Sequence, residues 1–279
     1  MCRWLAYSGS PVLLEDLLYK PENSLVVQSR HSRMGASTTN GDGFGVGWYG
    51  AYDNPGLFRS TEPAWNDLNL RELCAHARAG RVFAHVRAST DSAVQQTNCH
   101  PFRHGNWLWM HNGYLAGFRE MKRDLAMEVD PDLFADISGS TDSEMLFFLA
   151  LSFGLREDPR AGVARAVGLV EEVGRSRGIE FPVQMTVATT DGGTTWAFRY
   201  SSQGRSGSLY QSTDVSTLRV QYPDNPVFHA LSDDARLVVS EPLGDLQGAW
   251  REIPEATSVM VHGADDEVAP FVPISPTAT

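Results

Sequence analysis

The sequence is poor in cysteine, with three in 279 residues, and these stand far apart at Cys2, Cys74 and Cys99. Three scattered cysteines suit neither a disulfide framework nor a cysteine-rich zinc site, and their odd number is typical of a reducing compartment. Basic side chains are scarce as well, because 23 Lys and Arg against 34 Asp and Glu leave a net charge of −11. A surface this acidic repels phosphate backbones and anionic headgroups, which argues against binding to nucleic acid or to a membrane surface.

Long apolar runs are missing too. The best candidate, residues 147–151, is followed by Ser152 and Gly154, whereas a membrane-spanning helix needs about 18 apolar residues or more. A secretory signal is not expected either, because Glu15 and Asp16 come before any apolar segment has formed. We therefore expect a soluble, cytoplasmic protein.

The residues that are present fit one globular domain. Hydrophobic residues make up 42% of the chain and aromatic residues 10%, which is enough for a large core. The sequence has no internal repeat, and its breaks are short loops, so we expect a single domain over 1–279. A loose tail is expected from about Gly263, where Asp265, Asp266 and Glu267 precede prolines at 270, 273 and 276.

Hydrophobic periodicity divides the chain into a mixed first half and a second half of strands. Strands are expected over 25–28, 43–49, 81–87, 106–111, 183–189, 194–200, 209–212, 227–231, 237–240 and 258–262. Helices are expected over 67–79, from the 140–144 segment to 153, and from 158 to 178; the last two begin at capping residues. Antiparallel-looking strands with helices clustered in mid-chain favour an α+β layered fold.

Two patterns that suggest cofactor or metal sites do not hold. Residues 45–50 match the dinucleotide fingerprint Gly-x-Gly-x-x-Gly, but turn residues at 51–56 follow where that fingerprint needs a helix. These glycines are better explained by a strand that another backbone or a ligand approaches closely. His100 and His104 enclose Pro101, so they cannot share one face of a regular helix as metal ligands. Nothing in the sequence indicates a metal or an organic cofactor.

Cys2 is the first candidate for chemistry. If Met1 is removed, the thiol and a free α-amino group belong to the same residue. An α-amino group has a pKa of about 7.7–8.0, so its neutral form can accept the thiol proton near pH 7. One residue would then supply both nucleophile and base. The alternative is a cysteine that stands second by chance.

Three further features have a structural and a chemical interpretation. Arg87 ends the apolar run 82–86 and is either an exposed strand end or a fork for a carboxylate. Asn112 and Gly113 form either a hairpin turn or an amide and N–H pair for an oxyanion. Asp142 belongs to a capping box at 141–144, or it binds a substrate ammonium group. Together with Cys2, these groups are the set needed to cleave a γ-glutamyl amide.

A set of short motifs in fixed order resembles a known family. The motifs are Met-Cys-Arg at 1–3, Asp-Gly-Phe-Gly at 42–45, His-Val-Arg-Ala-Ser-Thr at 85–90, His-Asn-Gly at 111–113, Thr-Asp-Ser-Glu at 141–144 and Ser-Glu-Pro at 240–242. They look like those of class II glutamine amidotransferases, which belong to the N-terminal-nucleophile hydrolases. The resemblance implies a four-layer αββα sandwich with two antiparallel sheets.

The resemblance also implies roles for individual residues. Cys2 resembles the nucleophile of the family, and Asn112 with Gly113 resembles its oxyanion hole. Arg87 matches the residue that holds the substrate α-carboxylate, and Asp142 the one that holds the α-ammonium group. Ser89 and Thr90 lie beside Arg87 in the motif and are expected to touch the substrate.

The length is similar to that of freestanding family members, which include the ergothioneine-pathway amidohydrolase and the glutathione-degrading amidotransferase-like subunit. The larger members carry a second domain and place Trp-Ala-Thr-His or similar after the arginine, whereas this chain has Ala-Ser-Thr at 88–90. The implied function is hydrolysis of a small-molecule γ-glutamyl amide through a thioester. Two alternatives stay open: an ammonia-supplying subunit of a separate synthetase or peptidase chain, and a catalytically silent relative that binds a γ-glutamyl metabolite or a partner protein.

Overall fold

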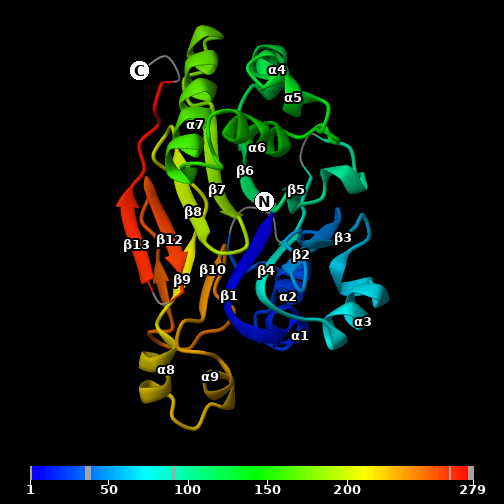
Figure 1. Ribbon diagram of the computed structural model, residues 1–279, viewed down its shortest axis with the longest axis vertical. Helices are drawn as coiled ribbons and strands as arrows, with labels where there is room; N and C mark the ends of the chain where they lie inside the picture. The colour runs from blue at the N-terminus through cyan, green and yellow to red at the C-terminus, as the bar shows by residue number, and fades with distance from the viewer. Residues whose placement is uncertain (1, 35–38, 90–91, 264, 276–279) are drawn as a thin grey trace.

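In the computed structural model, residues 2–34, 39–89, 92–263 and 265–275 are described (Figure 1). Two antiparallel sheets form its centre. The first contains, in spatial order, β11 (Trp250–Glu252), β9 (Tyr210–Ser212), β10 (Arg236–Val239), β1 (Arg3–Leu13), β4 (Arg78–Val86), β2 (Phe44–Tyr49) and β3 (Gly56–Ser60). The second contains β13 (Asp265–Pro270), β12 (Thr257–His262), β8 (Thr195–Ser201), β7 (Val183–Thr190), β6 (Trp107–Leu115) and β5 (Phe102–His104).

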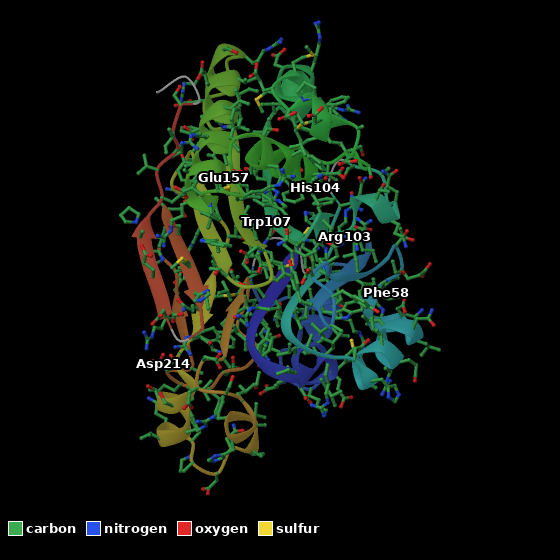
Figure 2. The ribbon with its side chains drawn as sticks, viewed as in Figure 1. Phe58, Arg103, His104, Trp107, Glu157 and Asp214 are labelled. Atoms are coloured by element: carbon green, nitrogen blue, oxygen red, sulfur yellow. The ribbon has the colours of Figure 1, made fainter. Side chains whose placement is uncertain are left out.

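Helices cover the outer face of each sheet. The first sheet is packed by α1 (Leu14–Leu18), α2 (Leu25–Arg30) and α3 (Leu68–His76), and the second by α4 (Phe118–Met127), α5 (Pro131–Phe134), α6 (Asp142–Ser152) and α7 (Pro159–Ser176). The short helices α8 (Val215–Gln221) and α9 (Pro226–Ala230) project from one end of the molecule (Figure 1). Asp214 lies where this end joins the sheets (Figure 2), and its carboxylate accepts a hydrogen bond from Arg236 Nη2 at 2.7 Å. No helix among the described residues has the length and apolar character of a membrane span.

Side-chain alternation along the strands creates three separate cores. In β1, Trp4 and Ala6 face the core between the two sheets, whereas Leu5 and Tyr7 face helices α1 to α3. In β6, Leu108 faces the same central core, and its neighbours face the helices of the second sheet. Three cores between four layers give the αββα arrangement, so the expected fold is confirmed.

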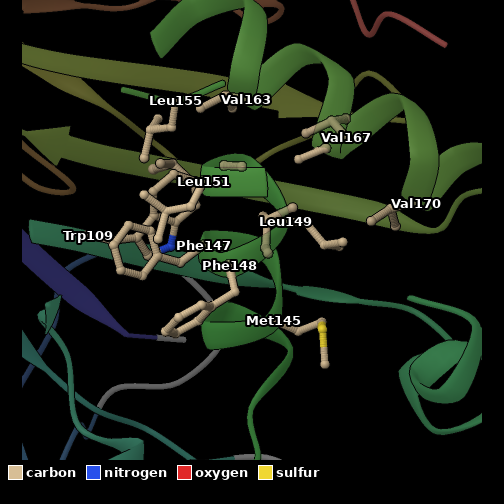
Figure 3. Packing of buried hydrophobic residues seen from close by; sticks show 14 of the residues in the cluster. Trp109, Met145, Phe147, Phe148, Leu149, Leu151, Leu155, Val163, Val167 and Val170 are labelled. Carbon is tan, nitrogen blue, oxygen red and sulfur yellow. The ribbon is translucent and has the colours of Figure 1, made fainter. Parts of the chain in front are cut away.

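Helix α6 is apolar on nearly every side, as its sequence predicts, because sheet and helices enclose it. Phe147 stacks on Trp109 of β6 with ring centroids 5.5 Å apart, while the valines of α7 pack from the other side (Figure 3). Its first residue therefore has a fixed position relative to β6, a point that matters for the site below.

Two expected strands are helices instead. Residues 25–28 lie in α2, where the side chain of Ser24 accepts the Val27 N–H and caps the helix. Residues 227–231 fall mostly in α9, which begins at Pro226 and is capped by Asn225. Valines in the first segment, and Val227 with Phe228 in the second, favour a strand, but a capping side chain just upstream stabilises a helix instead.

The expectation of a loose tail from residue 263 is wrong for 265–270. This segment forms β13, an edge strand paired with β12, with Val268 opposite Val259. Its acidic side chains have partners, since Arg160 Nη1 donates to Glu267 at 2.5 Å and Arg236 Nε to Asp266 at 2.9 Å. Charged side chains on an edge strand also discourage pairing with other chains.

Candidate active site

Cys2 lies beside the end of β4 at the centre of the molecule, near the N-terminal end of β1 (Figure 1). Because Arg3 of β1 pairs with Val86 of β4, the preceding residue, Cys2, is next to the residues that follow Val86. The Cys2 Sγ accepts a hydrogen bond from the Ala88 N–H at 3.4 Å and lies 3.6 Å from the Ala88 carbonyl oxygen. By alternation, the Cys2 side chain shares the inner face of β1 with Trp4.

The surroundings of Cys2 act on its thiol in opposite directions. Burial raises the pKa of the Cys2 thiol, while the Ala88 N–H and the guanidinium groups of Arg87 and Arg3 lower it. Burial has the largest effect, so the pKa stays above its ordinary value. A nearby base is therefore needed to form the thiolate near neutral pH.

Arg87 is a buried cation whose hydrogen-bond acceptors among the described residues are neutral groups. It is 3% exposed, and its guanidinium donates to Ser92 Oγ at 2.7 Å, Ser89 Oγ at 3.1 Å and the Asp42 carbonyl at 3.3 Å. Within the described ranges no carboxylate forms an ion pair with it. A buried guanidinium held only by neutral acceptors is suited to receive an anion, because an unpaired buried charge is costly.

Ser89 holds the loop after Arg87 in place. Its hydroxyl accepts from Arg87 and donates to the Ser92 carbonyl at 2.6 Å, and its N–H donates to Asp42 Oδ2 at 2.8 Å. These contacts make Ser89 a support for Arg87 in this structure. Thr90, the other expected contact residue, lies outside the described residues.

Asn112 and Gly113 belong to β6, which runs on to Leu115, so the hairpin-turn interpretation is wrong. They pair with Thr186 and Met185 of β7. By alternation Asn112 faces the core between the sheets. The residue is 4% exposed, and its side-chain oxygen Oδ1 is buried without a hydrogen-bond partner among the described residues. A buried polar atom that the described residues leave unbonded is available to a ligand.

Gly113 is required by its surroundings. Its φ is +153°, and a Cβ there would lie 1.9 Å from the Gln184 carbonyl oxygen and 2.7 Å from His111 Nε2. Only glycine fits such a close approach of neighbouring backbone. Gly45 is similar, since a Cβ there would lie 2.2 Å from the His100 carbonyl oxygen, which confirms the strand interpretation of 45–50.

Asp142 is the first residue of α6. Its carboxylate accepts the Leu115 N–H at 2.8 Å and the Ser143 N–H at 2.7 Å, which ties the start of α6 to the end of β6. No cation of the described segments forms an ion pair with it. The expected capping box is only half formed: Thr141 Oγ1 accepts the Glu144 N–H at 3.1 Å. The Glu144 carboxylate turns away and accepts backbone N–H groups of the 138–139 loop instead.

Asn98 is a connection that sequence reasoning missed. This fully buried residue donates from Nδ2 to the Ala93 carbonyl at 2.9 Å, and its Oδ1 accepts the Ser140 N–H at 2.9 Å. The same Ala93 carbonyl accepts from Arg87. Asn98 thus joins the loop around Arg87 to the segment that leads into Asp142.

Three buried histidines, also missed, lie next to these residues. His85 stacks on His100 with ring centroids 4.2 Å apart, and its Nε2 is 3.3 Å from the His111 carbonyl oxygen. His111 Nδ1 is 2.7 Å from Ser143 Oγ on α6. Burial lowers the pKa of all three, that of His85 to about 3, so they are neutral near pH 7.

Cavity size does not locate this site. An apolar cavity of about 800 Å³ lies at the end of the molecule that carries α8 and α9; these helices and parts of β1 and β10 line it, and none of the candidate residues do. In the described part of the chain, no group of three or more His, Cys, Asp or Glu residues is arranged to hold a metal ion. Residue chemistry therefore identifies the candidate site.

Comparison with known proteins places this arrangement in a family. Residues 20–182 match the family model of class II glutamine amidotransferases, a range that includes Arg87, Asn112, Gly113 and Asp142. The chain belongs to the class II glutamine amidotransferases.

Several members of the family are similar over different lengths. The probable glutamine amidotransferase DUG3 of Saccharomyces cerevisiae is 32% identical over 96% of this chain and 85% of its own. The gamma-glutamyl-hercynylcysteine sulfoxide hydrolase of Mycolicibacterium smegmatis is 35% identical over 40% of this chain and 51% of its own. A class II domain protein from Silicibacter pomeroyi has a TM-score of 0.75 at 32% identity and covers 98% of this chain and 100% of its own. These likenesses support the freestanding type of class II glutamine amidotransferase.

Proposed function

We propose that this chain hydrolyses glutamine or another γ-glutamyl amide, with Cys2 as the nucleophile once Met1 is removed. The observation that carries the proposal is the position of the Cys2 thiol. It is hydrogen-bonded to Ala88, next to a buried Arg87 that lacks an ion partner within the described ranges. A reactive sulfur beside an unpaired buried cation fits a substrate with a carboxylate near its cleaved bond.

The proposed reaction begins with proton transfer from the Cys2 thiol to its own α-amino group. The thiolate then attacks the δ-carbonyl carbon, and the oxyanion is held by the Asn112 amide and the Gly113 N–H. The C–N bond breaks, the leaving nitrogen takes the proton from the α-ammonium group, and a γ-glutamyl thioester remains. Water adds to the thioester, the C–S bond breaks, and free glutamate and the thiol are restored.

Arg87 and Asp142 bind the two charged ends of the glutamyl group in this proposal. Arg87 takes the α-carboxylate and Asp142 the α-ammonium group. Neither side chain forms an ion pair with another described residue, so both charges are available to a zwitterion. Water as the final acceptor agrees with the name of the Mycolicibacterium smegmatis relative, which is a hydrolase.

The deciding experiment is a substrate panel. Glutamine, glutathione and other γ-glutamyl amides are supplied, and released glutamate is measured. We expect wild-type protein to release glutamate from at least one of them, and Cys2→Ala to release none while still binding glutamate in calorimetry. Cys74→Ala, which removes a buried cysteine packed with the helices of the first sheet, serves as the matched control and retains activity.

Intact-mass measurement tests the premise about the amino group. We expect the mass of the chain to lack Met1. A retained Met1, or equal activity of wild-type protein and Cys2→Ala, contradicts the mechanism.

A further inference from the structure

A buried ion pair lies next to Cys2. Arg3 and Glu241 are 2% and 1% exposed, and Arg3 Nε lies 3.1 Å from Glu241 Oε2. Arg3 Nη1 donates to the carbonyl oxygen of Cys2 at 2.8 Å. The two residues are 238 positions apart in the sequence, and the proposed chemistry gives neither of them a role.

Glu241 is held by donors from several segments. Its carboxylate accepts hydrogen bonds, besides that of Arg3, from Asn23 Nδ2 at 2.9 Å, Ser32 Oγ at 3.1 Å, the Arg33 N–H at 3.0 Å and the Met34 N–H at 3.1 Å. Burial alone would raise the pKa of Glu241, but these donors outweigh it and lower the pKa. The carboxylate is therefore charged near pH 7, and its position is fixed from several sides.

The segment that carries Glu241 also holds the backbone of β1. The Ser240 N–H donates to the Trp4 carbonyl at 3.0 Å, and the Trp4 N–H donates to Ser240 Oγ at 3.1 Å. Residues 240–241 thus hold residues 3 and 4 through both main chain and side chain. Cys2 is then the first residue beyond a rigid anchor.

We propose that Arg3 and Glu241 are positioning residues that fix the orientation of Cys2 in the active site. The inference rests on the proposed function, in which Cys2 is the nucleophile. A residue at a chain end has a peptide bond on one side only, so its orientation depends on contacts of this kind. The Arg3 guanidinium holds the Cys2 carbonyl, Ala88 holds the thiol, and together they leave the thiol and the amino group little freedom.

The chain offers a matched control pair. Arg236 is 4% exposed and lies 2.9 Å from Asp266 and 2.7 Å from Asp214, at the opposite end of β10 from Ser240. It is as buried and as strongly paired as Arg3, but it makes no contact with Cys2. Arg236→Lys therefore reports the general cost of weakening a buried pair.

The test compares Arg3→Lys, Glu241→Gln and Arg236→Lys with wild-type protein. Arg3→Lys keeps the charge but cannot reach the Cys2 carbonyl, Glu241 and Ser32 at once as the guanidinium does. Steady-state glutamine hydrolysis is measured alongside the rate of Cys2 alkylation by iodoacetamide, followed by mass spectrometry. Cys74 and Cys99, both buried, report unfolding because they react only when the core opens.

We expect Arg3→Lys and Glu241→Gln to lower kcat at least tenfold with KM within twofold, since Arg87 and Asp142 are unchanged. Alkylation of Cys2 should accelerate at least threefold, because a less restrained thiol loses the burial that raises its pKa, while Cys74 and Cys99 stay unmodified. Arg236→Lys should match wild-type protein in both measurements. If Glu241→Gln does not fold, the test rests on Arg3→Lys, which is milder because it keeps the positive charge.

If Arg3→Lys has the same kcat and the same rate of Cys2 alkylation as wild-type protein, the positioning role is overturned. A wild-type chain that hydrolyses no γ-glutamyl amide contradicts the proposed function instead, and the alkylation rates still decide whether the pair restrains Cys2.

Discussion

Arg87 and Asp142 carry opposite charges that the described residues leave without ion partners. Each is held by neutral groups, Arg87 by hydroxyls and carbonyls and Asp142 by two backbone N–H groups. Such groups fix the direction of a charge without neutralising it. This arrangement is typical of a site that binds both ends of an amino acid.

Arg87→Lys should therefore raise the KM for glutamine by about 10- to 100-fold, with a smaller change in kcat. This is the loss of affinity expected when a charged hydrogen bond to the substrate is removed. A lysine ammonium supplies one point charge where the guanidinium supplies a fork. Steady-state kinetics measure both constants. Arg81→Lys is the matched control, because Arg81 lies on β4, the strand that ends just before Arg87, and donates to the carbonyls of Gly80 and Gly193. An unchanged KM in Arg87→Lys would remove its assigned role.

At this scale the sequence selects the candidate residues whose motifs are local, and their roles remain predictions. Cys2, Arg87 and Asn112 were singled out because their neighbours define them. Asn98 was not, and Glu241 entered only as part of the Ser-Glu-Pro motif at 240–242, since the contacts of both residues lie far along the chain. A buried pair such as Arg3 with Glu241 leaves no spacing pattern, and only the fold brings it together.

Helix α6 is the element that places Asp142. Its N-terminus is held by the Thr141 cap, by the Leu115 N–H and by the contact of Ser143 with His111. Its apolar body is enclosed by β6 and α7 (Figure 3). The helix therefore transmits any shift of its first turn directly to the proposed ammonium site.

Thr141→Ala should lower the free energy of unfolding by about 1 kcal/mol and raise the KM for glutamine several-fold. The side chain of Asp158 accepts the Ala161 N–H and caps α7 in the same way. Asp158→Ala should therefore lower the free energy of unfolding by a similar amount, with no change in KM. Urea unfolding and steady-state kinetics give the two quantities. Equal KM values in the two variants would show that the first turn of α6 does not bind substrate.

Helices and strands with a long hydrophobic pattern and a clear capping or turn residue were predicted well, whereas short helices and strands were not. Helices α6 and α7 begin at the expected caps, and β7 and β8 correspond to the strands expected over 183–189 and 194–200. Helices α2 and α9 have six and five residues, too few for a helical period to outweigh the strand preference of their β-branched and aromatic residues. Strand β13 was missed because its acidic run is typical of a solvated tail until β12 pairs with it.

At the scale of the whole molecule, the candidate site is divided between the two sheets. Cys2 and Arg87 directly adjoin strands β1 and β4 of the first sheet, and Asn112 and Gly113 belong to the second. His85 reaches across from β4 to the backbone of β6, and His100 stacks on it. Neutral imidazoles thus form part of the junction that aligns the two halves.

These histidines should make the fold sensitive to acid. The folded pKa of His85 is about 3, below its ordinary value of 6.5, so the unfolded chain takes up a proton first as pH falls. One such group removes about 1.4 kcal/mol of stability per pH unit below 6.5, and the loss continues until pH approaches the folded pKa. Urea unfolding between pH 7.5 and 4.5 measures the slope.

The matched variants are His85→Gln and His76→Gln. His85→Gln should show a shallower dependence of stability on pH, whatever its stability at pH 7.5. The side chain of His76 is 82% exposed, so His76→Gln should have the same slope of unfolding free energy against pH as wild-type protein. Identical slopes in all three proteins would mean that His85 is not the titrating group.

The ion pair between Arg3 and Glu241 has a consequence for biosynthesis. The ribosome makes Arg3 long before Glu241, so the contacts of residues 240–241 with residues 3 and 4 form only after most of the chain has been synthesised. In the proposed function, this order of synthesis leaves an interval for removal of Met1 before the buried pair forms beside Cys2.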